Sequence, residues 1–167
     1  DEFLSGLAEV VKHGAIADNG IIDLLTTKRC EILARDSATL TTLINRSLAV
    51  KQRIVEQDPL EVGIRRLLNF GHTVGHALEH LAPIKHGHAV SVGMCAAAYI
   101  SVERGLLSRS EALRLAQLLS DLGLPTKLEA NISDLVVGIG KDKKREEDFV
   151  HTVLLNSIGK AVIEKLA

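Results

Sequence analysis

The chain has 167 residues, of which 46% are hydrophobic and 25% charged, and this composition is typical of one globular domain with a sizeable core. Its 20 basic and 21 acidic residues give a formal net charge of -1, which excludes a whole-chain field that would attract nucleic acid or an anionic membrane. With 2% aromatic residues and no Trp, the chain also lacks the stacking platforms of proteins that bind single-stranded nucleic acids.

The first third of the chain predicts three helices. Apolar residues recur at helical spacing over residues 3–17, and Asn19-Gly20 supplies the break after them. A short helix is expected over residues 21–33 and a longer one over 39–55. Asp58-Pro59 ends the third helix, because the residue before a proline avoids the helical conformation.

The rest of the chain continues as helices and ends in a hairpin. Further helical segments are predicted over residues 65–81, 89–103, 112–122 and 131–140. Strands are predicted over residues 149–155 and 161–166, on either side of an Asn-Ser-Ile-Gly turn. We therefore expect a single, mainly α domain over residues 1–167, with a small β-hairpin near its C-terminus.

The cysteines and the apolar runs indicate the compartment. Cys30 and Cys95 lie far apart without CxxC spacing, as free thiols in a reducing compartment do. No apolar run approaches the length of a membrane span. We therefore expect a cytoplasmic protein. Because Asp1 enters the helical pattern at once and is not a Met, we also expect the parent protein to have a further N-terminal domain.

Five of the seven histidines fall between residues 72 and 88, which is denser than core packing alone would give. His72, His76 and His80 are spaced four apart and so share one helix face. His86 follows a proline turn that lets the chain fold back, and the glycine after it leaves room for a ligand. This cluster indicates a metal site, whereas His80 taken alone is interpreted as an ordinary surface residue.

A carboxylate would complete such a site, since two histidines and one carboxylate, with positions left open, form the ligand set of a catalytic zinc ion. Glu9 lies among apolar residues on its helix, where an unpaired charge would be costly to bury. Glu79 and Glu61 are rival carboxylates by spacing. The residues themselves thus predict a metal held by His72 and His86 and leave the carboxylate open.

The segment before the histidines supplies cations. Lys51, Arg53, Arg65 and Arg66 lie close to this polar face in sequence, and guanidinium groups bind carboxylates and phosphates in a fork. Standing alone, such residues would be interpreted as a solvated basic face. No GxGxxG, GxSxG or HExxH pattern occurs, so a nucleotide would be held mainly elsewhere.

Four blocks of the sequence resemble, in order, those of the 3-dehydroquinate synthase family. They are GLAEVVK at residues 6–12, RRLLNFGHTVGHALE at 65–79, HGHAVSVGM at 86–94 and DKK at 142–144. The second block is highly specific for this family and its sugar-phosphate cyclase relatives, whereas the last is weak alone. His88 stands where the family usually has Glu. The resemblance spans essentially the whole chain and implies the dehydroquinate synthase-like α-helical fold.

The resemblance also implies roles for individual residues. Glu9, His72 and His86 would ligate Zn²⁺ or Co²⁺, and the metal would polarise the substrate hydroxyl being oxidised. The implied substrate contacts are Lys12 at the reacting end, Lys51 and Arg65 at the carboxylate, and Asn69, His76 and one of Lys143 and Lys144 at the phosphate, with Glu61 as a further active-site carboxylate.

The same resemblance implies a reaction. The parent enzyme would convert the phosphorylated sugar acid 3-deoxy-D-arabino-heptulosonate 7-phosphate to 3-dehydroquinate and phosphate, in the shikimate pathway of aromatic amino acid biosynthesis. NAD⁺ would be bound mainly by an N-terminal Rossmann-like domain that this chain lacks, and the enzyme would be a homodimer. We therefore expect the isolated chain to be inactive by itself.

Three alternatives compete with this assignment. A sugar-phosphate cyclase such as 2-deoxy-scyllo-inosose synthase has no substrate carboxylate, and Arg65 and Lys51 argue against it. An iron-dependent alcohol or polyol dehydrogenase shares the architecture but lacks the phosphate block, so Asn69 and His76 argue against that reading. The third is a metal-binding fragment with no catalysis of its own.

Overall fold

The computed structural model describes residues 2–127 and 150–166. In chain order the elements are α1 (Glu2–Ala17), α2 (Asn19–Thr27), α3 (Arg29–Leu33), α4 (Ser37–Gln57), the 3-10 helix η1 (Ile64–Asn69), α5 (His72–Leu81), α6 (His86–Glu103), α7 (Arg109–Asp121), β1 (Val150–Ser157) and β2 (Lys160–Leu166). The mainly α class and the C-terminal hairpin are confirmed. The helix predicted over residues 131–140 lies outside the described residues.

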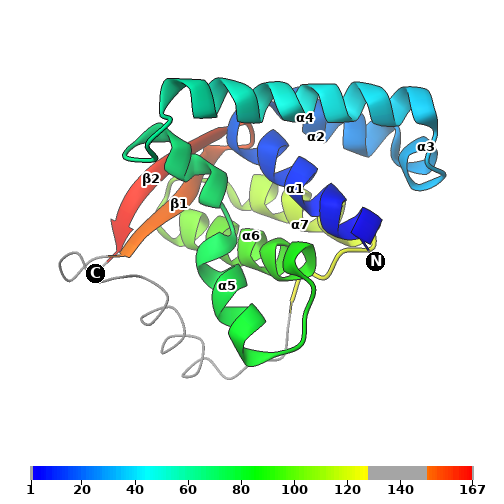
Figure 1. Ribbon diagram of the computed structural model, residues 1–167. Helices are drawn as coiled ribbons and strands as arrows, with labels where there is room; N and C mark the ends of the chain where they lie inside the picture. The colour runs from blue at the N-terminus through cyan, green and yellow to red at the C-terminus, as the bar shows by residue number, and fades with distance from the viewer. Residues whose placement is uncertain (1, 128–149, 167) are drawn as a thin grey trace.

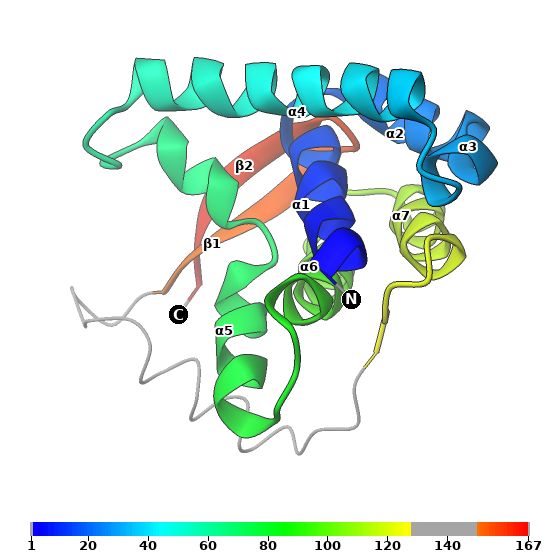
Figure 2. The same ribbon diagram turned by 45° about the vertical axis from the view of Figure 1, so that its right-hand side comes forward.

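Helices α1 and α6 form the centre of the molecule (Figures 1 and 2). Helix α1 packs on α2, α4 and α6, and α6 also packs on α5, α7 and strand β1. Fully buried side chains such as Val11, Ile22, Met94 and Leu154 come from four of these elements and make one continuous core. None of the described helices is both long and apolar enough to cross a membrane.

Two predicted helices are each interrupted in the structure. The segment predicted as one helix over residues 21–33 is two helices, α2 and α3, with the break at Lys28. Just before the break, the hydroxyls of Thr26 and Thr27 donate to the carbonyls of Ile22 and Asp23, a local competition that weakens a helix end.

The block predicted as one helix over residues 65–81 is also wrong as a continuous element. It divides into η1 and α5 at Gly71, whose φ of +79° is a conformation that a side chain would strain. Because of this break, His72 becomes the first residue of α5. In the same way α6 begins at His86, three residues before its predicted start, so that both histidines stand at helix N-termini.

The C-terminal hairpin packs against the two central helices. Strands β1 and β2 are antiparallel, with Val153 opposite Ile163. The amide of Leu155 donates to the buried hydroxyl of Ser101 on α6, over 3.0 Å. At the turn, the amide of Gly159 donates to the carbonyl of Ala15 on α1. These two bonds fix the hairpin to both central helices.

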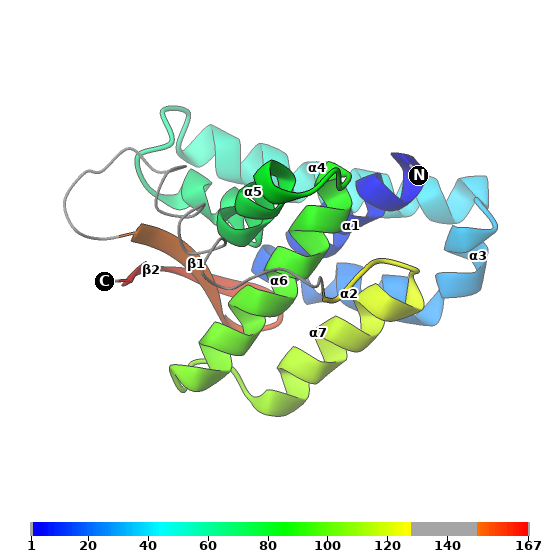
Figure 3. The ribbon, with the colours of Figure 1, turned by 90° about the horizontal axis from the view of Figure 1, so that it is seen from below.

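Glycines set the close approach of α1, α5 and α6, which lie together when the domain is seen from below (Figure 3). A Cβ atom added to Gly93 would lie 1.9 Å from the carbonyl oxygen of Gly71, and one added to Gly87 would lie 2.3 Å from that of Ser5. The amide of Gly87 also donates to the Ser5 hydroxyl. The backbones therefore touch at the place where the candidate site is assembled.

Candidate metal centre

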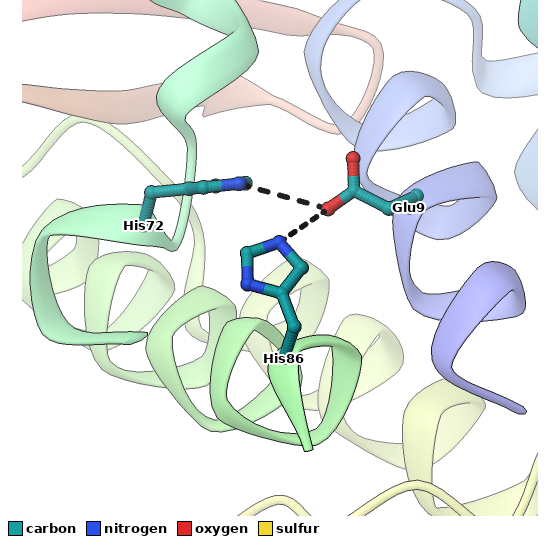
Figure 4. Close-up of side chains that lie close together, drawn as sticks. All are labelled: Glu9, His72 and His86. Carbon is teal, nitrogen blue, oxygen red and sulfur yellow. Dashed lines mark ion pairs between the residues drawn. The ribbon is translucent and has the colours of Figure 1, made fainter. Parts of the chain in front are cut away.

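Three side chains from three helices converge on one point. Glu9 comes from the middle of α1, and His72 and His86 are the first residues of α5 and α6 (Figure 4). One ligand atom from each lies within 4.8 Å of the other two. The Nε2 atoms of His72 and His86 are both 3.7 Å from Oε1 of Glu9. Residues far apart in the sequence are thus gathered into a set of two imidazoles and one carboxylate.

The hydrogen bond at Nδ1 of each histidine decides which tautomer the neutral ring adopts. Nδ1 of His72 lies 3.2 Å from the carbonyl oxygen of Phe70, and Nδ1 of His86 lies 3.1 Å from Oε1 of Glu79. A carbonyl and a carboxylate oxygen only accept, so each neutral ring donates from Nδ1 and keeps a lone pair on Nε2. Both lone pairs are therefore available on the atoms that face Glu9.

The environment keeps His72 neutral. Burial, followed by the charge of Lys12, lowers the pKa of His72 to about 4. Its place at a helix N-terminus acts in the same direction, because the positive end of the helix dipole disfavours an imidazolium. A neutral imidazole is the form that binds a metal.

Lys12 holds the carboxylate in place. Its ammonium donates to Oε2 of Glu9 over 2.5 Å, and its side chain is only 5% exposed. Burial works to raise the pKa of Glu9, but the charge and hydrogen bond of Lys12, together with smaller effects of His72 and His13, bring it below the usual value. Burial lowers the pKa of Lys12 although Glu9 opposes this. The carboxylate is thus ionised and anchored by one oxygen.

The other carboxylate oxygen, Oε1, is buried and accepts no hydrogen bond among the described residues. Two lone pairs and this oxygen face one another at 3.7 Å, too far for hydrogen bonds and repulsive without a cation between them. A zinc ion with bonds of about 2.0–2.2 Å sets neighbouring ligand atoms roughly 3.3–3.5 Å apart. The residues present therefore fit a divalent metal and leave further coordination positions open.

His76 borders this centre one helical turn beyond His72. Its ring centroid lies 5.4 Å from that of His72 and 6.3 Å from that of His86. The shared helix face predicted for the histidines of α5 is confirmed in this pair, whereas His80 is exposed. His88 is partly buried, and its buried Nε2 atom forms no hydrogen bond with the described residues.

Three other residues predicted to bind the substrate lie on α4 and η1. Lys51 is exposed on α4 and near enough to Lys12 to contribute to its lowered pKa, after burial and the opposing Glu9. The guanidinium of Arg65 donates to the carbonyl of Pro59 over 2.8 Å. Nδ2 of Asn69 donates to Oε1 of Glu61 over 3.1 Å.

Glu61 therefore belongs to this second group and not to the metal ligands. Its Oε2 is 3.7 Å from Nε of Arg65, and its backbone has φ of +58°, a left-handed conformation that is uncommon for a residue with a side chain. Lys143 and Lys144 lie outside the described residues.

The sequence interpretation missed the function of Asp58, which it treated only as the end of a helix. Asp58 is buried, and its carboxylate accepts from the amides of Val62, Gly63 and Arg65. These bonds, that of Arg65 first, hold its pKa below the usual value against the opposing effect of burial. Asp58 shapes the loop that carries Glu61. An Asp directly before a Pro and three residues before a Glu was the available signal.

Comparisons with known proteins agree with this arrangement. Residues 6–145 match the family model described as 3-dehydroquinate synthase C-terminal. The chain is 39% identical over 165 residues to a 3-dehydroquinate synthase of Dehalococcoides mccartyi (strain CBDB1), covering 97% of this chain and 46% of that protein. It is 38% identical over 169 residues to one of Pyrobaculum neutrophilum, covering 99% and 49%. The chain thus spans about half the length of these curated relatives.

Solved structures share the fold. The 2-epi-5-epi-valiolone synthase ValA from Streptomyces hygroscopicus subsp. jinggangensis 5008, solved with NAD⁺ and Zn²⁺ bound, superposes with a TM-score of 0.89 at 25% identity, over 99% of this chain and 47% of ValA. A 2-deoxy-scyllo-inosose synthase complexed with carbaglucose-6-phosphate, NAD⁺ and Co²⁺ gives 0.76 at 23% identity, over 98% and 49%. With the family model covering most of its length, this chain belongs to the 3-dehydroquinate synthase family and corresponds to its C-terminal region.

Proposed function

We propose that Glu9, His72 and His86 bind one divalent metal ion, Zn²⁺ or Co²⁺. The observation that carries this proposal is the buried, unbonded Oε1 of Glu9, which lies 3.7 Å from two Nε2 atoms whose rings donate elsewhere. Relatives of known structure hold Zn²⁺ or Co²⁺. Three ligands leave room for a substrate oxygen, as a catalytic site requires.

The parent enzyme, in this proposal, is a 3-dehydroquinate synthase. It would convert 3-deoxy-D-arabino-heptulosonate 7-phosphate to 3-dehydroquinate and phosphate, and the curated relatives bear the name 3-dehydroquinate synthase. When bound, the metal would stabilise the negative charge that develops on the substrate hydroxyl during its oxidation. NAD⁺ would serve as the hydride acceptor.

The residues around the centre suit a substrate with a carboxylate and a phosphate. The buried Lys12 would contact the reacting end, close to Glu9. Arg65 and Lys51 would bind the carboxylate. The guanidinium of Arg65 donates to the carbonyl of Pro59 and has further N–H donors with which it could bind a carboxylate in a fork. Preorganised cations of this kind bind a doubly anionic substrate without a large rearrangement.

The phosphate would lie near Asn69 and His76. Asn69 donates to Glu61, and the ring of His76 lies 5.4 Å from that of His72 and 6.3 Å from that of His86. We assign these two residues, with one of Lys143 and Lys144, to the phosphate. His76 would donate to the departing phosphate oxygen.

The same proposal covers the parts that this chain does not contain. NAD⁺ would be bound mainly by a Rossmann-like N-terminal domain, so the isolated 167-residue chain would be inactive. The parent enzyme would be a homodimer in the cytoplasm, a compartment in which the two free cysteines would stay reduced.

The test is phosphate release by the full-length parent enzyme with NAD⁺ and metal. We expect release from the heptulosonate phosphate and a large loss of kcat/KM in Arg65→Met, because the carboxylate would lose its forked partner. A hexose 6-phosphate, which has no carboxylate, should be a poor substrate. Preference for the hexose phosphate, with no effect of Arg65→Met, would instead favour an inosose synthase.

A further inference from the structure

Glu79 contacts the candidate centre from outside. It lies near the end of α5, and its Oε1 is 3.1 Å from Nδ1 of His86, the first residue of α6. The ring of His86 separates this carboxylate from the Nε2 atom that faces Glu9. Glu79, a candidate ligand by sequence spacing, is therefore on the wrong side of the imidazole to reach the same metal.

His86 needs such a contact more than His72 does. The His72 side chain is 12% exposed and its Nδ1 meets a backbone carbonyl, so packing and backbone hold the ring. The His86 side chain is 47% exposed, so packing restricts its ring less than that of His72. The bond to Glu79 is the only hydrogen bond recorded for the His86 ring in the described part of the chain.

We propose that Glu79 is a positioning residue: its carboxylate holds Nδ1–H of His86 and thereby aims the Nε2 lone pair at the point shared with Glu9 and His72. A carboxylate behind a metal-bound histidine fixes the tautomer and the ring orientation and makes the other nitrogen a stronger ligand. The inference rests on the proposed metal site, and it adds Glu79 as a fourth residue that contributes to the metal affinity of that site.

The closest competing explanation is a purely structural link. Glu79 and His86 join the end of α5 to the start of α6, and a bond between two helices adds stability whether or not a metal binds. The two explanations differ in what they predict for the imidazole. A structural link leaves zinc affinity and tautomer unchanged once the fold is intact, whereas a positioning contact changes both.

The variants are Glu79→Ala, which removes the acceptor, and Glu79→Gln, whose side chain has the same length and keeps one neutral acceptor oxygen. Glu103→Gln is the matched control, since it removes one negative charge from an exposed residue at the far end of α6. Nitrogen-15 spectra of the histidine rings in the metal-free chain report the tautomer, and competition with a chromophoric chelator reports zinc affinity. Thermal unfolding of each metal-free variant measures its stability.

We expect wild type and Glu103→Gln to show His86 protonated at Nδ1 and to bind zinc equally well. Glu79→Ala should show the mixed tautomers of a solvated imidazole and bind zinc about 10–100-fold more weakly, with Glu79→Gln in between. An unchanged His86 tautomer in Glu79→Ala, whatever its zinc affinity, overturns the positioning role. Altered tautomers in a protein whose wild type binds no zinc would uphold the contact and refute the metal site instead.

Discussion

The two sides of the candidate site are built in different ways. The metal side consists of Glu9, His72 and His86 on helices whose backbones touch through glycines, and its groups are already aimed at one point. The substrate side lies on a loop and a 3-10 helix, where Arg65 and Asn69 bond to neighbours within the same segment. Helix packing thus fixes the geometry of the candidate metal ligands, whereas the candidate substrate residues are held by local hydrogen bonds that a ligand could replace.

The largest effect should come from disturbing the helix contact behind the metal side. Gly93→Ala would place a Cβ atom 1.9 Å from the Gly71 carbonyl oxygen, and a backbone atom cannot move aside as a side chain can. We expect about 3 kcal/mol or more of lost unfolding free energy in urea, since overpacking typically costs 1–3 and backbone contacts yield least. Metal binding should be lost as well.

Gly6→Ala, on α1, is the matched control, because a Cβ added there would meet no other element of the described chain within 4 Å. It should stabilise the chain by up to about 1 kcal/mol, the helix preference of alanine over glycine. Equal stabilities for the two variants would show that α5 and α6 are not in the close contact described here.

The second effect concerns the buried histidine behind the metal side. Nδ1 of His13 lies 2.7 Å from the hydroxyl of Ser47, and burial, followed by Lys12, lowers the pKa of His13 to about 4. The unfolded chain takes up this proton near pH 6.5 and the folded chain only near pH 4, so stability is complete above pH 6.5 and falls as the pH drops through that window. The loss should be on the order of 3 kcal/mol, because each unit of pKa difference corresponds to about 1.4 kcal/mol.

His13→Asn should remove this contribution and flatten the dependence of unfolding free energy on pH between 6.5 and 4. The comparison is of slopes, since His72 contributes to both proteins in the same direction. Identical slopes would mean that His13 is protonated in the folded chain near its ordinary pKa.

A smaller effect is expected when the loop on the substrate side is loosened. Asp58→Asn replaces a carboxylate that accepts from three amides with a side chain that presents one acceptor and one donor. Hydrogen exchange should become faster at Val62, Gly63 and Arg65 while the amides of α5 and α6 keep their protection. Faster exchange throughout the domain would show that the two sides are not independent.

The smallest effect is a difference in cysteine reactivity that leaves stability unchanged. Cys30 is exposed, whereas Cys95 lies partly buried on α6 and burial raises its pKa to about 12. Thiolate is the reactive form, so an alkylating reagent at neutral pH should modify Cys30 rapidly and Cys95 slowly. Mass spectrometry measures both rates. Rapid modification of Cys95 in the native protein would indicate that the packing around α6 opens.

Much of this arrangement could be predicted from the sequence, because it depends on periodic patterns. The apolar spacing of α1, α4 and α6 gives each helix within a few residues, and the four-residue spacing places His72 and His76 on one face. What could not be predicted depends on tertiary contacts. The helical period continues through Gly71, whereas the chain breaks there, at the point where its backbone meets Gly93.

The choice among carboxylates shows the same limit. Spacing alone leaves Glu9, Glu61 and Glu79 equivalent, and the family resemblance points to Glu9. The structure separates the three by position: Glu9 faces both Nε2 atoms, Glu79 lies behind one ring, and Glu61 belongs to the loop. Such distinctions arise from how helices cross, which no local pattern in the sequence encodes.

The central claim is that Glu9, His72 and His86 together hold one metal ion. The direct measurement is the metal content and zinc affinity of the purified chain, with wild type beside Glu9→Ala, His72→Ala and His86→Ala and with Glu103→Gln as the control. We expect near-stoichiometric zinc in wild type and in the control, and loss of zinc in all three ligand variants while their helical circular dichroism is retained. Zinc that stays bound in all three variants, or folded wild-type protein that takes up none, would contradict it.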